Sequence, residues 1–172
     1  MPQVPRRLRW AVERLDVRPD DRILEIGCGR GVAAELVCEL LSGGRYFGID
    51  RSASAINGAE ARNAGHVTAG RAEFLVAPVE GTDLTTHGPF DKAFAVNVNL
   101  FWTHDPAHEL GLIDAALASD GGLHLFFEPP SAAQIARIDA ALTATLTEYG
   151  LAVESATDPT GSILCVSGRR KA

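Results

Sequence analysis

A glycine-rich turn between a buried strand and a helix is the feature that most constrains how this chain can fold. Residues 22–31 read Arg-Ile-Leu-Glu-Ile-Gly-Cys-Gly-Arg-Gly, and residues 46–50 read Tyr-Phe-Gly-Ile-Asp. The first segment is typical of an apolar strand that runs through a glycine turn into a helix, and the second of a strand that ends in an acid. Glycines let a backbone approach a ligand closely, and an acid at the tip of the second strand can accept both ribose hydroxyls. The arrangement predicts a pocket for an adenosine-bearing cofactor.

Length and charge narrow the class of protein. A chain of 172 residues predicts a single domain over 1–172 with a sizeable core, in which 1–19 form a leading helix segment and 20–168 the cofactor-binding core. Lys and Arg number 16 against 22 Asp and Glu, which gives a net charge of −6. A nucleic-acid-binding surface usually needs a basic face, so no nucleic-acid partner is expected.

The cysteines and the apolar segments indicate which cellular compartment to expect for the protein. Cys28, Cys38 and Cys165 form no CxxC pair, which favours reduced thiols in a cytoplasmic protein. The first ten residues carry charges but no apolar h-region, and no run of about 18 apolar residues occurs anywhere. Neither a signal peptide nor a membrane span is expected.

Strand and helix patterns alternate along most of the chain. Gly43-Gly44 and Gly65 are expected to stop helices, Ser52 to cap one, and Asp105-Pro106 to start one as N-cap and first helical residue. Ser131 with Gln134 forms a capping-box pattern. The patterns predict strands at 23–26, 46–49, 73–76, 93–96 and 123–127, and helices at 5–15, 31–41, 52–63, 106–117 and 131–149.

The C-terminal part follows a different plan. Residues 151–156 and 162–168 are strand-like, and only five residues separate them. No helix fits in that gap, so the two strands must form an antiparallel hairpin. A nicotinamide-binding domain would more naturally add another strand–helix unit.

Together these features resemble the class I S-adenosylmethionine-dependent methyltransferases. The matching pieces are Leu24–Gly31, Gly48–Asp50, Ala61–Asn63 with Ala69–Arg71, Phe90–Asn97, Phe101-Trp102, Asp105-Pro106 and Gly121–Leu123. The resemblance implies an α/β fold: a three-layer Rossmann-like sheet, mostly parallel, of seven strands, with an antiparallel C-terminal hairpin strand. It also implies S-adenosyl-L-methionine as cofactor.

The same resemblance assigns roles around the glycine turn. Glu25 corresponds to the acid that interacts with the methionyl ammonium; its alternative role is to tether the glycine loop. Gly27, Gly29 and Gly31 correspond to positions where the backbone passes under the methionine and ribose, and Cys28 between them suits the loop because it is small.

Further positions follow the second and third strands. Asp50 corresponds to the ribose acid, since a carboxylate accepts two charge-assisted hydrogen bonds from a diol. Arg51 either covers one adenine face or is solvated. Val79 and Glu80 match the loop whose backbone N–H reads the adenine edge, but Pro78 stands where the family usually has Asp or Ser.

The candidate acceptor region follows the fourth and fifth strands. Asn97 lies where strand order should reverse, and it either supports the cofactor, faces the acceptor or caps the strand. Trp102 either walls the acceptor pocket or covers the core, and His104 is either a base or an exposed residue beside a helix cap. Glu128 belongs to the same edge, over which residues 6–10 could fold. His66, His87, His108 and His124 share no ligand-type spacing, so no metal is expected.

The resemblance implies in-line methyl transfer to a small-molecule acceptor, in a monomer or homodimer. Two other functions stay open. One is an NAD(P)-dependent oxidoreductase that uses the same glycine and acid positions. The other is a non-catalytic S-adenosylmethionine-binding module that needs a partner chain.

Overall fold

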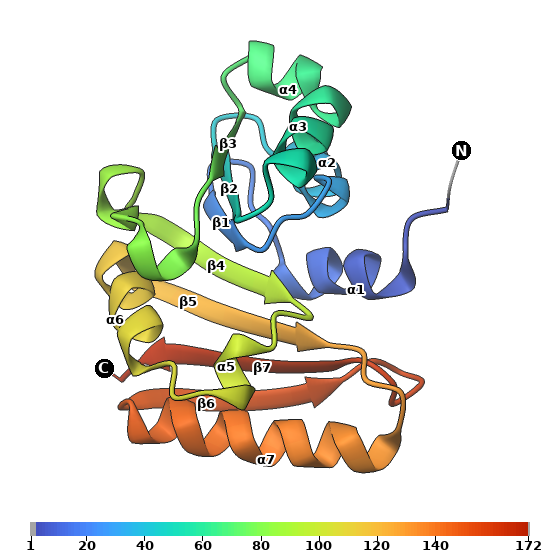
Figure 1. Ribbon diagram of the computed structural model, residues 1–172, viewed down its shortest axis with the longest axis vertical. Helices are drawn as coiled ribbons and strands as arrows, with labels where there is room; N and C mark the ends of the chain where they lie inside the picture. The colour runs from blue at the N-terminus through green and yellow to red at the C-terminus, as the bar shows by residue number, and fades with distance from the viewer. Residues whose placement is uncertain (1–2, 172) are drawn as a thin grey trace.

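The computed structural model describes residues 3–171, and within them seven strands form one twisted sheet (Figure 1). Across the sheet the order is β3-β2-β1-β4-β5-β7-β6. Neighbours from β3 to β5 pair in parallel, whereas β7 runs antiparallel to both β5 and β6. The strands are β1 (Arg22–Ile26), β2 (Arg45–Asp50), β3 (Ala72–Val76), β4 (Phe90–Val96), β5 (Leu117–Phe127), β6 (Leu151–Thr157) and β7 (Leu164–Arg170).

Helices cover both faces of this sheet. On one face of the sheet, side chains of α1, α2 and α3 pack with strand residues in one buried cluster. On the other face, side chains of α5, α6 and α7 pack with strand residues in a second cluster. This confirms the predicted three-layer α/β sheet with its reversed C-terminal hairpin. The α-helices are α1 (Arg6–Leu15), α2 (Val32–Leu40), α3 (Ala53–Arg62), α4 (Ala64–Thr68), α5 (Leu100–Thr103), α6 (Ala107–Ala116) and α7 (Ala132–Glu148), and the 3-10 helices are η1 (Val79–Gly81) and η2 (Leu84–Thr86).

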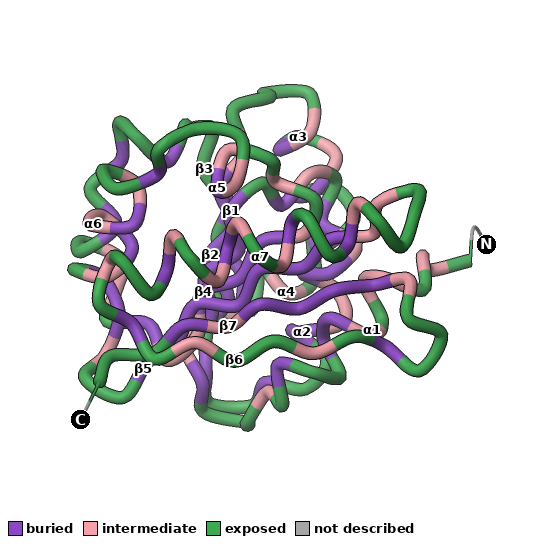
Figure 2. The backbone as a smooth tube through the Cα atoms, turned by 90° about the horizontal axis from the view of Figure 1, so that it is seen from below, coloured by how far each residue is buried: buried purple, intermediate pink, exposed green. Residues whose placement is uncertain are grey.

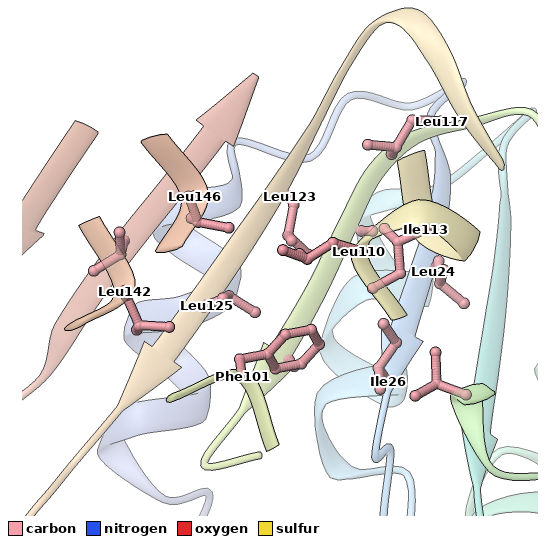
Figure 3. Close-up of a cluster of buried hydrophobic side chains, with 14 of the residues drawn as sticks. Leu24, Ile26, Phe101, Leu110, Ile113, Leu117, Leu123, Leu125, Leu142 and Leu146 are labelled. Carbon is pink, nitrogen blue, oxygen red and sulfur yellow. The ribbon is translucent and has the colours of Figure 1, made fainter. Parts of the chain in front are cut away.

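The central strands are buried from both sides. In Figure 2 their backbone lies in the middle of the molecule, while the loops around it are exposed. Figure 3 shows how leucines of β1 and β5 meet side chains of three helices. A strand buried on both faces has no polar face to alternate with, which is why β1 and the end of β5 are mostly apolar, each with one buried polar residue, Glu25 and His124. The labelled contacts come from Leu24, Ile26, Phe101, Leu110, Ile113, Leu117, Leu123, Leu125, Leu142 and Leu146.

The structure confirms the predicted helix ends at which a side chain caps the helix or a glycine terminates it. The Ser52 hydroxyl accepts a hydrogen bond from the N–H of Ala55, and that of Ser131 from the N–H of Gln134. Gly150, with a φ of 102° in the left-handed region, follows Tyr149, the C-cap of α7. At such a position glycine avoids the steric cost of a Cβ atom.

The start of β5 differs from the prediction. The helix was expected to include Leu117 and the strand to begin at Leu123. Instead α6 ends at Ala116, and Leu117 is already a buried strand residue that pairs with Phe90. The next regular pair is Lys92 with Gly122, so β5 bulges between them. A Cβ on Gly121 would lie 2.8 Å from the carbonyl oxygen of Phe90, so this bulge passes too close to β4 for a side chain.

The short α-helices α4 and α5 and the 3-10 helices η1 and η2 were not predicted, and two helix boundaries were wrong. Gly65 does not stop a helix, because α4 continues past it and the chain turns at Gly70 with a φ of 68°. The four-residue α5 follows β4. Helix α6 begins at Ala107 rather than at Pro106, although the Asp105 carboxylate does accept the N–H of Ala107 at 3.0 Å.

Candidate cofactor site

The glycine turn after β1 is held over the end of β2 by backbone hydrogen bonds. The N–H groups of Gly27 and Cys28 both donate to the carbonyl oxygen of Ile49, at 2.9 and 3.0 Å. Gly27, Gly29 and Gly31 have φ values of 72°, 54° and 73°. These left-handed conformations favour glycine strongly, so the three positions are fixed by backbone geometry before any ligand is considered.

The three glycines nevertheless have different surroundings. A Cβ on Gly31 would lie 2.6 Å from Nδ2 of Asn63 and 2.9 Å from Cβ of Ala59, so this glycine lets α2 approach α3. A Cβ on Gly27 would lie 2.8 Å from a methyl group of Val98. At Gly29 no atom lies within 4 Å of that point. Of the three, only Gly29 has open space at the point where a side chain would begin.

Asp50 is oriented by two backbone donors. Its carboxylate oxygens accept the N–H of Gly29 and the N–H of Ser52, each at 2.9 Å. A carboxylate has about four lone-pair positions, so two such bonds leave acceptor capacity on each oxygen. The side chain thus links the glycine turn to the start of α3 and still faces a cleft.

That cleft has a volume of about 520 Å³ and lies at the carboxyl ends of β1, β2 and β4. This is the edge of the sheet where ligands of open α/β folds bind, at the point where strand order reverses. The predicted residues Gly27, Asp50, Arg51, Val79, Asn97 and His104 line it, together with Ile26, Ile49, Ala77, Pro78, Val96, Val98, Asn99, Leu100 and Thr103. Cys28, Glu80 and Trp102 are not among its lining residues, and neither are Glu25, Gly29, Gly31 and Glu128.

Glu25 lies beneath the glycine turn. It is only 2% exposed, and Oε2 of its carboxyl accepts a hydrogen bond from the Tyr46 hydroxyl. A Cβ on Gly48 would lie 2.8 Å from that hydroxyl, so Gly48 makes the room in which the two side chains meet. Burial raises the pKa of Glu25 to about 8; the Tyr46 hydrogen bond opposes this, and the Asp50 charge adds to it. The hydrogen bond joins Glu25 to β2 and not to residues 27–31, so both roles expected for Glu25 stay predictions.

Cys28 is also buried, and the same surroundings act on its thiol. Burial raises the pKa of Cys28 far above its ordinary value, and the charges of Glu25 and Asp50 raise it further. The thiol therefore stays protonated and is a poor nucleophile. This agrees with the interpretation that Cys28 is present because it is small.

Arg51 lines the cleft, and Glu80 pairs with it from outside the lining. Their charged groups are 3.7 Å apart, and the side chains are 72% and 46% exposed. An exposed pair of this kind contributes little to stability and leaves both side chains free to move. Val79 is buried and begins η1.

Asn97 ends β4 in an unusual conformation. Its φ is 57°, its N–H donates to the carbonyl oxygen of Phe126, and its Oδ1 accepts the N–H of Glu128 at 2.9 Å. The side chain thus joins the ends of β4 and β5, which supports the capping role, while the residue also lines the cleft.

Trp102 packs against the core, whereas His104 lines the cleft. The Trp102 indole N–H donates to Oδ1 of Asn99, its ring packs against the core, and the Arg137 guanidinium lies 6.0 Å from the ring centre. His104 is exposed, lines the cleft, and has Nδ1 at 2.8 Å from the Thr103 hydroxyl. Of the two, His104 is the one that the structure brings to the cleft.

The segment expected to fold over the opening is part of a helix packed on the sheet. Trp10 of α1 meets Phe126 edge-on, with ring centres 5.8 Å apart. At the start of α1, Arg6 and Arg7 pair with Glu128 at 3.7 and 3.3 Å. These contacts occupy Glu128 with arginines, and they place the basic N-terminal residues beside the carboxyl end of β5.

Several neighbours of the site were missed in the sequence. Tyr46 shares a strand face with Gly48, which pairs with Glu25, so the period of two could have indicated the Tyr46–Glu25 contact. Val98, Asn99 and Leu100 gave no signal, because they belong to the loop and short helix after β4. Among residues 3–171, no group of three His, Cys, Asp or Glu side chains could hold a metal, and the described helices include none long and apolar enough to cross a membrane.

Comparison with known protein families identifies the family of this chain. A family described as "Methyltransferase domain" matches residues 23–122, more than half of the chain. A comparison with curated proteins gives no match.

Many solved structures resemble the fold. One is the complex of the Haloferax volcanii Trm112 methyltransferase activator with a candidate methyltransferase, at 19% identity and a TM-score of 0.76, covering 96% of this chain and 89% of that one. A Thermotoga maritima S-adenosylmethionine-dependent O-methyltransferase has 16% identity and a TM-score of 0.72, covering 98% and 66%. A mitomycin 7-O-methyltransferase has 22% identity and a TM-score of 0.72, covering 95% and 54%. The chain thus spans only about half to two thirds of the latter two. At these identities the likeness shows the fold alone.

Proposed function

The chain belongs to the methyltransferase domain family, and from that premise we propose that it is an S-adenosylmethionine-dependent methyltransferase that acts on a small-molecule acceptor. The observation that carries the proposal is Asp50, which lines the cleft while its carboxylate is oriented by the N–H groups of Gly29 and Ser52. A pre-oriented carboxylate at the end of the second strand suits a ribose diol.

The residues of the cleft fit such a cofactor. Gly29 does not itself line the cleft, but it bonds to Asp50 and has open space at the point where a side chain would begin; Asp50 keeps acceptor capacity for two hydroxyls. Gly27 and Asn97 border the space between β1 and β4, where the methionyl part would be held. A volume of about 520 Å³ is within the usual range for small-molecule sites.

The adenine end would lie between Arg51 and η1. Val79 offers a buried apolar side chain to the ring, and Arg51 is exposed enough to move over its face. Pro78 has neither a backbone N–H nor a side-chain acceptor, so no hydrogen bond from that side chain reaches the adenine amino group. We propose that adenine is held chiefly by apolar contact and by the backbone of η1.

S-adenosylmethionine supplies a methyl group on a sulfonium, which transfers in line to a nucleophile. The chain's part is to hold acceptor and cofactor in line and to keep water out. We propose that the acceptor lies beside Asn97 and His104, at the cleft wall formed by the loop after β4 and by α5. Asn97 orients and His104 borders the acceptor; no base is required when the acceptor is itself a good nucleophile.

A small acceptor is favoured by the chain's acidic character and by the absence of a basic groove along the cleft, where Arg51 is the single arginine or lysine among the lining residues. The mitomycin enzyme of similar fold is named for a small-molecule acceptor. The alternative is a domain that needs a partner chain, and the complex with an activator of methyltransferases keeps this alternative in view.

Calorimetry with S-adenosylmethionine, S-adenosylhomocysteine and NADH tests the cofactor. We expect heat of binding with the first two and none with NADH, and the reverse would assign the chain to the oxidoreductases. A screen of small-molecule acceptors that detects released S-adenosylhomocysteine tests the activity. Cofactor binding without turnover of any acceptor would favour the partner-dependent module, and gel filtration of the same sample would distinguish monomer from homodimer.

A further inference from the structure

A second cavity lies at the opposite end of the parallel strands from the cofactor cleft. It has a volume of about 240 Å³ and is bordered by the end of α1, the loop before β1, the starts of β4 and β5, and the end of β7. Lys92 lines it and Val96 lines the cleft. These residues are four apart on β4, which corresponds to about 13 Å. The cavity is therefore separate from the cofactor site.

A buried histidine faces this cavity with one nitrogen unpaired. His124 of β5 is 5% exposed, and its Nδ1 lies 2.9 Å from the Ser167 hydroxyl on β7. Its Nε2 has no hydrogen-bond partner among residues 3–171. A buried polar atom without a partner costs roughly 1–3 kcal/mol, so this atom is expected to meet a group that the protein itself does not provide.

Gly122 shows where that nitrogen points. A Cβ on Gly122 would lie 3.2 Å from Nε2 of His124 and 3.4 Å from Nε of Arg169. Gly122, His124 and Arg169 all line the cavity. The missing side chain therefore leaves a space in which the histidine nitrogen and a guanidinium approach the same point.

The charges nearest to His124 are positive. Burial, together with the smaller effects of the charges of Arg169, Lys92 and Arg14, lowers the pKa of His124 to about 4. Lys92 pairs with Asp21. Within the described part of the chain, neither Arg14 nor Arg169 has a carboxylate at ion-pair distance.

The cavity is also lined by four carboxylates, two of which already accept hydrogen bonds. Asp21 accepts from Lys92 and from the N–H of Arg18, and Asp91 accepts from the N–H of Arg22. Asp16 and Asp120 are exposed residues at its rim. The lining as a whole is balanced in charge, but the charges that act on His124 are cationic.

We propose that this cavity binds a small oxyanion of the phosphate class, with His124 Nε2 donating a hydrogen bond and Arg14 and Arg169 supplying the positive charge. The proposal assigns the proton of the neutral ring to Nε2, with Nδ1 accepting from the Ser167 hydroxyl 2.9 Å away. A guanidinium and an N–H donor that converge on one point suit a compact anion with several acceptor oxygens.

Titration of the folded protein with inorganic phosphate tests the site. Calorimetry at constant ionic strength gives the affinity, and backbone amide NMR shifts give the location. We expect saturable shifts at Gly122, His124 and Arg169, and weaker binding of acetate because a dianion interacts more strongly with the two arginines. Acetate binding as tight as phosphate, or phosphate shifts that do not saturate, would overturn the proposal.

Two arginine variants separate a site from general surface charge. Arg169→Gln should weaken phosphate binding by about tenfold or more, the loss expected for one hydrogen bond to a charged group. Arg170→Gln is the matched control, since it removes the same charge from the next residue, whose side chain bonds to Asp114 instead. It should change the affinity by about twofold at most, because separated surface charges are screened. Equal effects of the two variants would contradict a defined site.

The histidine is tested in the same way. His124→Gln keeps an amide donor but moves it, so phosphate binding should weaken by about tenfold, with folding checked by circular dichroism. Asp120→Asn should strengthen binding, because it removes a competing negative charge at the rim. Unchanged affinity in both His124→Gln and Arg169→Gln would show that phosphate binds elsewhere.

Discussion

Asp50 links the glycine turn to α3 and presents its remaining lone pairs to the cleft. Asp50→Ala should therefore weaken S-adenosylhomocysteine binding by about 1.5–3 kcal/mol, the scale of hydrogen bonds to a charged group. Calorimetry measures the affinity, and thermal unfolding shows that the variant is folded. Asp83→Ala is the control, because Asp83 also accepts a backbone N–H, that of Thr85, but does not line the cleft. Equal affinity of wild type and Asp50→Ala would remove the ribose assignment.

Gly29 combines a left-handed backbone with open space where a side chain would be. Gly29→Val should abolish cofactor binding, because the branched side chain fills that space, and it should also lower stability by roughly 1–2 kcal/mol through the positive φ. Gly161→Val is matched, since Gly161 has a φ of 71° and the same open surroundings in the β6–β7 turn. It should lower stability similarly and bind the cofactor normally. Impaired cofactor binding in both variants would show that backbone strain, and not a side chain filling the ligand space at Gly29, causes the loss.

Glu25 gives the stability a pH dependence. The folded state raises the pKa of this carboxyl from 4.5 to about 8, so between these values the folded chain holds a proton that the unfolded chain releases. Stability therefore falls as pH rises through this window, by on the order of 1 kcal/mol per pH unit from this group. Urea unfolding of wild type and Glu25→Gln at a series of pH values measures the difference, which should favour the variant increasingly above pH 4.5. Glu60→Gln, on the exposed face of α3, should follow the wild type; parallel profiles for Glu25→Gln would refute the shift.

The position of a candidate site residue could be predicted from the sequence where it depends only on backbone conformation and on the place of the residue along its strand. Asp50 and Gly29 belong to a pattern that spans adjacent strands, so the sequence order already places them at one edge. Gly31 could not be recognised as a packing residue, because Asn63 and Ala59 reach it from another helix. The direction of Trp102 depends on a short helix that has no periodicity of its own.

Among the elements, α5 and the turn after it decide which side chains reach the acceptor side. His104→Ala should lower turnover by less than about tenfold, because an exposed imidazole bonded to its neighbour Thr103 is not held as a base; loss of a general base costs about 10²-fold or more. Initial rates with an acceptor found by screening measure this. Trp102→Ala should lower stability through lost core packing and leave acceptor affinity unchanged. A loss of 10²-fold or more in His104→Ala would instead identify His104 as the base.

Elements with strong periodicity or local stop signals were predicted well, and those fixed by tertiary pairing were not. Helix α7 has an apolar stripe, a serine cap and a terminal glycine, all readable in sequence. By contrast, Leu117 fits a helical stripe and a strand equally, and its pairing with Phe90 decides between them. Helix α4 is too short for a periodic signal.

For the whole molecule, binding of the cofactor at the cleft should raise the free energy of unfolding. A ligand that binds only the folded state at 100 times its dissociation constant raises the free energy of unfolding by about 2.7 kcal/mol. Urea unfolding with S-adenosylhomocysteine should show this gain, and Asp50→Ala at the same ligand concentration should show less. NADH should give none. A gain with NADH alone would contradict the proposed cofactor. The single-domain division, with 20–168 as the core, stays a prediction, and residues 1, 2 and 172 lie outside the described part of the chain.

Strand β7 follows β6 in the sequence yet lies between β5 and β6 in the sheet. During synthesis, β6 therefore has no place in the sheet until residues 164–170 have left the ribosome, because only β7 joins it to β5. Until then, β5 has an open edge next to a hydrophobic face, which is the kind of surface that attracts other chains. In this topology β6 reaches the sheet only through β7, so we expect the two strands to add to β5 together, as one hairpin.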